Sequence, residues 1–325
     1  MSAWPIALDD VKAARERLRP HLAPTPLRSY SALDEAVGEG VRVLVKHENF
    51  QPTGAFKVRN GVSALTLLRP EQLSRGVVAA TRGNHGLGLA WAARRLGAPA
   101  TVCVPVGNNP EKNAAVRGLG ARLVEEGRDY DESVAAAERL VREEGLHLVH
   151  STNDRAVVAG AGTLTLEMLE EAPGLEALVF SVGGGSQAVG GLTVTRAVKA
   201  GLPVYAVQAA GASAIHDAWH LGRPVSRPSA DTFADGLATR NTYPFTFPAL
   251  REGLAGFVTA TDAEIAHAVR LLLATTHTLV EGAGAAGLAG LLKLREALAG
   301  RTVGIVLSGA NIDRATLGRV LAGEL

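Results

Sequence analysis

The chain has 325 residues, of which 47% are hydrophobic and 20% charged, so it is long enough for two globular domains with sizeable cores. The 33 basic and 32 acidic residues leave a net charge of +1, which excludes a whole-chain electrostatic attraction to nucleic acid or to an anionic membrane. Cys103 is the only cysteine, so the chain cannot form an internal disulfide framework. Glycine is abundant at 37 residues, and the question is whether these glycines bind a ligand or only form turns.

Targeting and membrane-spanning patterns are absent from the sequence. The first residues do not combine a basic region with an apolar core, and no run reaches the ~18 apolar residues of a spanning helix. We therefore expect a cytoplasmic protein that binds neither membrane nor nucleic acid.

The first elements expected along the chain are a helix at residues 9–18 and a strand at residues 41–46. From residue 76 onward, strands and helices alternate. The expected strands are residues 77–80, 101–104, 122–124 and 146–149, and the expected helices are residues 87–96, 111–119 and 131–144. The alternation resumes with expected strands at 177–181, 204–208 and 302–307 and expected helices at 262–273 and 285–298. This rhythm predicts an α/β fold with parallel sheets and right-handed crossovers.

Three polar turns directly follow predicted strands, at Gly83-Asn84-His85, at residues 183–186 and at residues 308–311. Ligands of open α/β sheets bind beyond the carboxyl ends of the strands, so these turns are candidates for one shared site. Residues 211–255 are less regular and rich in Pro, Ser and Thr, and we expect them to form a loop region over that site.

The turn that contains Gly183, Gly184 and Gly185 lies between a predicted strand and a predicted helix. Its backbone N–H groups can hold a phosphate, and a plain tight turn is the alternative. A dinucleotide site needs an acidic residue at the end of the next strand, but that strand ends at Gln208, and the strand after the Gly83 turn ends at Pro105. NAD is therefore disfavoured, and the Gly-x4-Gly-Lys-Ser/Thr loop of nucleotide triphosphatases does not occur.

Lys57 follows a turn that Pro52 and Gly54 impose on the segment Gln51-Pro-Thr-Gly-Ala-Phe-Lys57. A lysine whose amine is partly neutral can form a Schiff base with a carbonyl compound. From this segment alone, a solvent-facing lysine at a helix start is the commoner explanation.

Six short motifs occur in a fixed order along nearly the whole chain. They are Pro-Thr-Gly-Ala-Phe-Lys57, Gly83-Asn84-His85, Gly183-Gly184-Gly185, Ala234-Asp235-Gly236, Glu281-Gly-Ala-Gly and Ser308-Gly-Ala-Asn311. In order and spacing they resemble the fold type II pyridoxal-phosphate enzymes, most closely the serine/threonine dehydratase (threonine ammonia-lyase) and serine racemase-like group. The resemblance implies two open-sheet α/β domains of the tryptophan synthase β-like type, pyridoxal 5'-phosphate as cofactor, and a homodimer or homotetramer. It places a large cofactor-binding domain at residues 1–70 and 151–325 and a small mobile domain at residues 71–150.

The resemblance also assigns roles to individual residues, first among them Lys57, which would carry the cofactor as a Schiff base. Further cofactor contacts would come from Phe56 along the ring, Asn84 at the ring hydroxyl, Gly183, Gly184, Gly185, Ser186 and Gln187 at the phosphate, Gly236 over the ring face and Ser308 at the pyridine nitrogen. The substrate carboxylate would be held by the loop of Thr81, Arg82, Gly83, Asn84 and His85.

The implied reaction is β-elimination. A hydroxyl such as that of Ser308 does not force protonation of the pyridine nitrogen, which suits elimination better than a long-lived carbanion. We expect the dehydration and deamination of a small β-hydroxy amino acid, such as L-threonine or L-serine, to a 2-keto acid and ammonia. A 3-hydroxyaspartate dehydratase, another β-substituted amino-acid ammonia-lyase and a catalytically silent protein that binds pyridoxal phosphate are the alternatives.

Arg82 departs from the resemblance, because many members of the group have Ser-Ser-Gly-Asn-His where this chain has Thr81-Arg82-Gly-Asn-His85. In the racemase the second serine acts as acid and base, and an arginine that is always protonated is unsuited to that task, so we expect no racemisation. The Arg82 guanidinium either pairs with an acidic substrate side chain, as in a 3-hydroxyaspartate, or points away into a structural ion pair.

Gln208 is a second departure, because racemase-like members have there a glutamate that helps to bind a divalent cation. The segment from Gln208 to Ala214 contains no carboxylate, and hard divalent cations require carboxylate oxygens, so we expect no metal site. Ser186 is a third departure, since it replaces a usual fourth glycine and its hydroxyl could also reach the phosphate.

Overall fold

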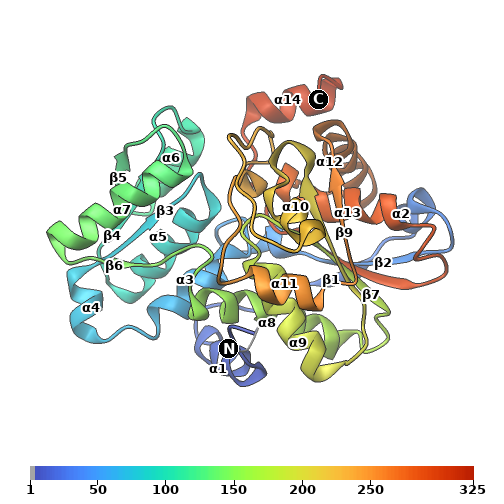
Figure 1. The fold of residues 1–325 in the computed structure, drawn as a ribbon, viewed down its shortest axis with the longest axis horizontal. Coiled ribbons are helices and arrows are strands. Elements are labelled where there is room, and N and C mark those ends of the chain that lie inside the picture. The colour runs from blue at the N-terminus through green and yellow to red at the C-terminus, as the bar shows by residue number, and fades with distance from the viewer. Residues whose placement is uncertain (1–3) are drawn as a thin grey trace.

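The computed structural model describes residues 4–325, and its strands form two separate sheets (Figure 1). The larger sheet contains, in spatial order, β1 (Leu27–Ser29), β2 (Arg42–Lys46), β10 (Thr302–Val306), β7 (Ala177–Ser181), β8 (Val204–Ala209) and β9 (Gly256–Ala260). The smaller sheet contains β5 (Arg122–Glu125), β4 (Ala100–Val104), β3 (Val77–Ala80) and β6 (His147–Leu148). In the described part of the chain, β1 pairs antiparallel with β2, and every other strand pair is parallel.

Helices cover both faces of each sheet. They are α1 (Leu8–Leu18), α2 (Ser31–Val37), α3 (Lys57–Leu65), α4 (Pro70–Arg75), α5 (Asn84–Leu96), α6 (Pro110–Gly118), α7 (Tyr130–Glu144), α8 (Arg155–Glu171), α9 (Ser186–Val198), α10 (Ala214–Leu221), α11 (Phe247–Gly253), α12 (Asp262–Thr276), α13 (Gly282–Leu294) and α14 (Arg314–Ala322). On the larger sheet, α2, α12 and α13 pack on one face, and α1, α8, α9 and α11 pack on the other. Strands buried on both faces are typical of parallel sheets, which explains why these segments are apolar throughout.

The smaller sheet shows how the alternation of side chains along a strand divides a core. Val77 and Ala79 of β3 pack toward α3 and α5, whereas Val78 and Ala80 pack toward α7. Cys103, fully buried in β4, belongs to the second of these clusters, as expected for a core residue.

The structure confirms the predicted α/β fold with two parallel-sheet domains, and the predicted strands agree with the observed ones to within one residue at each end. All strands of the smaller sheet lie between residues 77 and 148. Residues 211–255 are more regular than expected because they contain α10 and α11. Among residues 4–325, no helix combines the length and the apolar character that crossing a bilayer requires.

Three helices meet almost backbone to backbone at the junction of the two sheets. A Cβ atom on Gly61 of α3 would lie 2.4 Å from the carbonyl oxygen of Gly88 of α5, and a Cβ atom on Gly88 would lie 2.4 Å from that of Lys57. On the α8 side, a Cβ atom on Gly160 would lie 2.7 Å from the carbonyl oxygen of Arg59. These glycines therefore allow α3, which begins with Lys57, to be clamped between α5 and α8.

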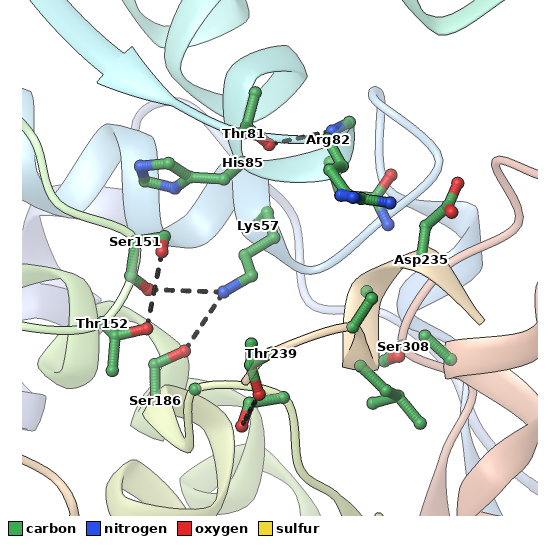
Figure 2. Close-up of a pocket in the computed structure, with 18 of the residues that line it drawn as sticks. Lys57, Thr81, Arg82, His85, Ser151, Thr152, Ser186, Asp235, Thr239 and Ser308 are labelled. Carbon is green, nitrogen blue, oxygen red and sulfur yellow. Dashed lines mark hydrogen bonds between the residues drawn. The ribbon is translucent and has the colours of Figure 1, made fainter. Parts of the chain in front are cut away.

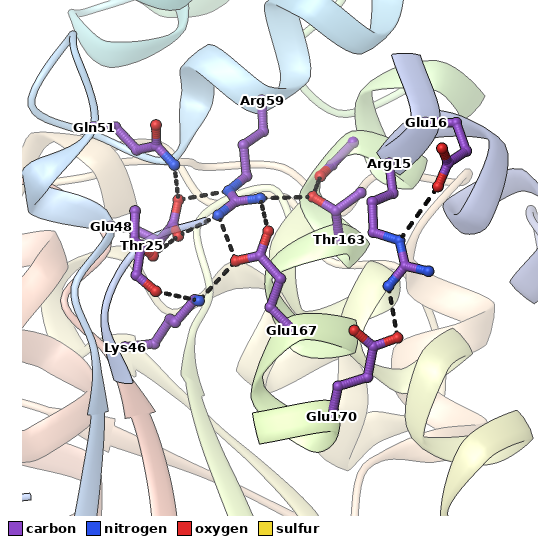
Figure 3. Close-up of polar contacts among 11 residues, drawn as sticks. Arg15, Glu16, Thr25, Lys46, Glu48, Gln51, Arg59, Thr163, Glu167 and Glu170 are labelled. Carbon is purple, nitrogen blue, oxygen red and sulfur yellow. Dashed lines mark hydrogen bonds and ion pairs between the residues drawn. The ribbon is translucent and has the colours of Figure 1, made fainter. Parts of the chain in front are cut away.

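A buried charged cluster lies below the first turn of α3 (Figure 3). Arg59 donates to both carboxylate oxygens of Glu48 at 2.8 Å, and to those of Glu167 on α8 at 2.6 and 2.8 Å. Lys46 of β2 pairs with Glu167 at 2.7 Å, and the Arg59, Glu48 and Lys46 side chains are at most 2% exposed. Burial alone would raise the pKa of Glu48, but Arg59 holds it below its ordinary value. The cluster thus fixes the start of α3 to β2 and α8.

Candidate active site

A cavity lies between the two sheets, where the carboxyl ends of their strands face each other (Figure 2). It brings together every residue to which the sequence assigned a role. These are Phe56, Lys57, Thr81, Arg82, Gly83, Asn84, His85, Gly183, Gly184, Gly185, Ser186, Gln187, Gly236 and Ser308.

Lys57 projects into the cavity from the first residue of α3 (Figure 2). Its Nζ donates to the hydroxyl of Ser186 at 3.2 Å and to the carbonyl oxygen of Ser151 at 3.5 Å. Burial lowers the pKa of the amine to about 8, because desolvation disfavours its charged form and no carboxylate among the described residues pairs with it. The amine is therefore far more often neutral, and hence nucleophilic, than that of an exposed lysine.

The turn from Gly183 to Gly185 has no room for side chains. A Cβ atom on Gly183 would lie 2.3 Å from the carbonyl oxygen of Gly236, and one on Gly184 would lie 2.0 Å from the hydroxyl of Thr152. Gly185 has a φ angle of +97°, which a residue with a side chain rarely adopts. Glycine is therefore required at all three positions, for two different reasons.

The same turn presents unused hydrogen-bond donors. Within residues 4–325, no protein acceptor is bonded to the backbone N–H groups of residues 183–187, which lead into α9. The Nε2 atom of Gln187 is buried and has no partner there either. Free N–H groups at a helix start form an anion site, since the helix dipole adds partial positive charge.

The opposite wall is the turn that connects β3 to α5. The backbone N–H of Gly83 donates to the hydroxyl of Thr81 at 2.9 Å. His85 donates from Nε2 to the carbonyl oxygen of Val149 at 2.9 Å, and burial lowers its pKa to about 3. His85 is thus a neutral imidazole whose buried Nδ1 has no partner in the described residues.

Asn84 and Glu281 are joined at the back of the cavity. Asn84 donates from Nδ2 to Glu281 at 2.5 Å and accepts from Asn311 Nδ2 at 2.7 Å. Burial raises the pKa of the Glu281 carboxyl to about 7. A Cβ atom on Gly309 would lie 2.3 Å from a Glu281 oxygen, so this glycine leaves room for the pair. One hydrogen of the Asn84 amide remains free to bind a ligand.

Two ion pairs cross the rim of the cavity from one sheet region to the other. Lys112 of α6 lies 2.7 Å from Asp235, and burial alone would lower the Lys112 pKa, but Glu281 and Asp235 raise it. Arg240 lies 2.5 Å from Asp131 at the start of α7. The second pair lies between partly exposed groups and is therefore weaker than a buried one.

Sequence reasoning missed several residues of the cavity wall. Those missed are Lys112, Tyr130, Ser151, Thr152, Ser181, Asp235, Leu237, Ala238, Thr239, Tyr243, Glu281 and Ala283. Asp235 and Glu281 lie inside motifs that were already in view, so they could have been assigned. The other residues come from turns and helix ends whose sequence carries no such signal.

Comparison with known proteins identifies the family. The description "Pyridoxal-phosphate dependent enzyme" matches residues 18–309. The chain belongs to the pyridoxal-phosphate dependent enzymes. It is 38% identical to a protein named L-threonine ammonia-lyase from Geobacter sulfurreducens, over 96% of this chain and 77% of the relative. It is 34% identical to a protein named L-threo-3-hydroxyaspartate ammonia-lyase from a Pseudomonas species, over 97% of this chain and 98% of the relative. The solved structure of maize serine racemase superimposes with a TM-score of 0.92 at 28% identity, covering 99% of this chain and 98% of the other.

The cavity of this pyridoxal-phosphate enzyme fits the cofactor that defines the family. An aldehyde requires an amine, and Lys57 supplies a buried one of lowered pKa. A phosphate requires a donor-rich pocket without side chains, and the Gly183–Gly185 turn offers one next to Ser186. An aromatic ring requires room beside the cavity wall, and Gly236, which has no side chain, lines the cavity.

Gln208 lies outside this cavity, at the end of β8. Its Oε1 accepts from the backbone N–H of His216 at 2.9 Å, and its buried Nε2 has no partner among residues 4–325. In the described part of the chain, no three His, Cys, Asp or Glu side chains are grouped so as to hold a metal ion. The absence of a divalent-cation requirement stays a prediction.

Proposed function

We propose that this protein is an ammonia-lyase that removes water and then ammonia from a small β-hydroxy amino acid such as L-threonine or L-serine, leaving a 2-keto acid. The observation that carries this proposal is the buried Lys57 amine, which faces the side-chain-free Gly183–Gly185 turn across one cavity. Membership in the pyridoxal-phosphate dependent enzymes and the ammonia-lyase names of its relatives support it.

Bound pyridoxal phosphate supplies the electron sink that makes the substrate Cα–H bond acidic. Lys57 would hold the cofactor, and its free Nζ would accept the Cα proton of the substrate. Ser186 lies 3.2 Å from that nitrogen and keeps it near the phosphate cradle. The Cβ–O bond would then break, and the hydroxyl would leave as water with the proton that Nζ took from Cα. The released enamine would hydrolyse to the keto acid and ammonia.

The remaining residues bind and orient. The N–H groups of residues 183–187 would hold the phosphate, Phe56 and Gly236 would enclose the ring, and Ser308 and Asn84 would bind its polar edge; all of these residues line the cavity. The turn from Thr81 to His85 holds the substrate carboxylate at the start of α5.

The assay that tests the proposal follows keto-acid and ammonia release by the holoenzyme from L-threonine, L-serine and other β-substituted amino acids. Lys57→Ala should abolish turnover and the visible absorbance of the bound cofactor, whereas Lys12→Ala, at an exposed position of α1, should change neither. A Lys57→Ala protein with full absorbance and turnover would refute the mechanism. A wild-type holoenzyme that turns over none of these amino acids would favour the catalytically silent alternative.

Racemisation is not part of the proposed activity. Arg82 occupies the position where a neutral hydroxyl would be needed to return a proton from the other face. The measurement is the incubation of L-serine in deuterated water, and labelled D-serine formed as fast as pyruvate would contradict this expectation.

We further propose that residues 71–150 act as a small mobile domain that closes on a large domain of residues 1–70 and 151–325. The Lys112–Asp235 and Arg240–Asp131 pairs join the two across the cavity rim and support this division. We also propose that the chain works in the cytoplasm as a homodimer or homotetramer, and its single buried thiol suits a reducing compartment. Sedimentation of the holoenzyme tests the oligomeric state.

A further inference from the structure

Arg82 is a cation on the wall of the cavity that has no partner in the described part of the chain. It lies in the turn between β3 and α5, and Figure 2 shows its side chain reaching into the space between Lys57 and Asp235. Among residues 4–325 its guanidinium makes no ion pair and no hydrogen bond, and its Nε is buried without a partner. The structural ion pair that was one alternative for Arg82 is therefore not formed.

The carboxylates nearest to Arg82 in the cavity are already engaged. Asp235 pairs with Lys112 at 2.7 Å, and Glu281 accepts from Asn84 at 2.5 Å. Burial raises the pKa of Glu281 to about 7, so this group carries only part of a negative charge near neutrality. The chain itself supplies no counter-ion for Arg82, although a partly buried guanidinium without one is costly.

The cofactor phosphate is not a suitable counter-ion either. The phosphate cradle surrounds Ser186, which in Figure 2 lies across the cavity from Arg82, with Lys57 between them. The substrate carboxylate on Cα can bind the N–H groups at the start of α5, next to Arg82. What remains to pair with Arg82 is a second anionic group on the substrate itself.

We propose that Arg82 binds the second carboxylate of a dicarboxylic β-hydroxy amino acid, so that the preferred substrate class is a 3-hydroxyaspartate. This inference rests on the proposed function and specifies its substrate. The guanidinium presents two parallel N–H donors that match a carboxylate, which gives both affinity and orientation. Threonine has a methyl group and serine a hydrogen at that place, so neither neutralises Arg82.

The reaction balances without a further reactant. 3-Hydroxyaspartate loses the proton on Cα and the hydroxyl on Cβ as water, and the electron pair of the Cα–H bond forms the new carbon–carbon double bond. The released enamine takes up water and loses ammonia. The products are oxaloacetate and ammonia, with no net oxidation or reduction.

The experiment measures kcat/KM of the holoenzyme for the threo and erythro isomers of L-3-hydroxyaspartate and for L-threonine. We expect the wild type to prefer one hydroxyaspartate isomer. In Arg82→Met the ratio of that kcat/KM to the value for threonine should fall roughly 30-fold or more, because a buried charge partner is lost. In Arg82→Lys, which keeps the charge but lacks the two parallel N–H donors, this ratio should lie between those of the wild type and Arg82→Met. Arg95→Met, at an exposed position of the same α5 region, should leave the ratio unchanged.

A second readout is independent of turnover. Calorimetric binding of L-aspartate to the holoenzyme should be tighter than binding of L-2-aminobutyrate, which lacks the second carboxylate, and Arg82→Met should remove the difference. Equal losses on threonine and hydroxyaspartate would place Arg82 at the Cα carboxylate and overturn the inference, as would an unchanged ratio. If the wild-type holoenzyme turned over none of these amino acids, the proposed function would be refuted. The comparison of aspartate with 2-aminobutyrate binding would still decide the role of Arg82.

Discussion

Arg59→Met tests whether the buried charged cluster below α3 holds the protein together. The change keeps an unbranched side chain of similar length but removes the contacts to Glu48 and Glu167, all between 2.6 and 2.8 Å. Lys46 remains beside Glu167, whereas the Glu48 carboxylate, fully buried, keeps no cation in direct contact. Removing one partner of a buried ion pair costs about 3–5 kcal/mol.

The expected change in melting temperature follows from the size of the chain. At about 2.1 cal/mol/K per residue, unfolding of 325 residues has an entropy of about 0.7 kcal/mol/K. A loss of about 3–5 kcal/mol therefore lowers Tm by about 4–7 °C. The measurement is thermal unfolding of the cofactor-loaded protein, followed by circular dichroism at fixed scan rate and concentration.

Helix α8, which carries Glu167, also provides the matched control. Arg15 pairs with Glu170 of α8 at 2.6 Å, but these side chains are 30% and 53% exposed (Figure 3). Arg15→Met should cost about 0–1 kcal/mol and lower Tm by at most about 2 °C. If Arg59→Met is no more harmful than Arg15→Met, the cluster does not stabilise the fold as argued.

A pH series separates a lost charge pair from lost packing. In the wild type the Glu48 pKa is lowered, so its contribution to stability is present above its ordinary value of 4.5 and is lost as the pH falls below it. Without Arg59 the buried carboxyl is easier to protonate, and its charged form is destabilising at higher pH. The Tm difference between wild type and Arg59→Met should therefore widen from pH 5 to pH 8, and a constant difference would contradict this account.

Three further predictions concern the cavity. In Gly184→Ala the new Cβ would lie 2.0 Å from a threonine hydroxyl, so cofactor affinity should fall roughly tenfold or more. The affinity is measured by titrating the cofactor-free protein with the cofactor. The control Gly174→Ala, whose Cβ meets nothing within 4 Å, should leave the affinity unchanged. A Lys57 pKa of about 8 leaves roughly 9% of the amine neutral at pH 7, against roughly 0.03% for a pKa of 10.5. Amine-specific labelling of Lys57 in the cofactor-free protein should therefore reach half its limiting rate near pH 8. An apparent pKa near 10.5 would contradict the burial argument. Because the Glu281 pKa is raised to about 7, the protonated carboxyl stabilises the folded state, and this stabilisation is lost as the pH rises from 4.5 through 7. Tm should therefore fall more between pH 5 and pH 8 in the wild type than in Glu281→Gln. Parallel Tm profiles would refute this prediction.

Most of the strands were predictable because they are short apolar runs that end in a turn, whereas β1 and β9 were not predicted. The β3 segment, Val77–Ala80, is buried along its whole length, and its composition alone indicates that. Helix α8 was missed because 12 of its 17 residues are buried, so it shows little of the polar and apolar alternation by which a surface helix is predicted. Helices α5 and α13 begin three residues earlier than expected, since their first turns contain glycines that resemble a loop.

The candidate site was predictable where chemistry depends on a local motif. The Gly183–Gly185 turn could be proposed from its own segment, because it lies between a strand and a helix. Lys57 could be assigned only from the order of the six motifs, because its own segment favoured a solvent-facing lysine. Glu281 could be placed inside a motif, but its burial and its bond to Asn84 could not be predicted, because the bond joins residues 197 positions apart in the chain. The charged cluster around Arg59 could not be predicted for the same reason, because its members lie on β2, in the turn that follows it, on α3 and on α8.

The glycine contact between α3 and α5 has a mechanical consequence. Because Gly61 and Gly88 have no side chains, the backbones of α3 and α5 lie in direct contact, and flanking side chains such as Val62 and Leu89 pack into one cluster. Larger side chains at these two positions would push the two helices apart. The contact therefore holds Lys57, the first residue of α3, at a fixed place beside the turn that begins α5.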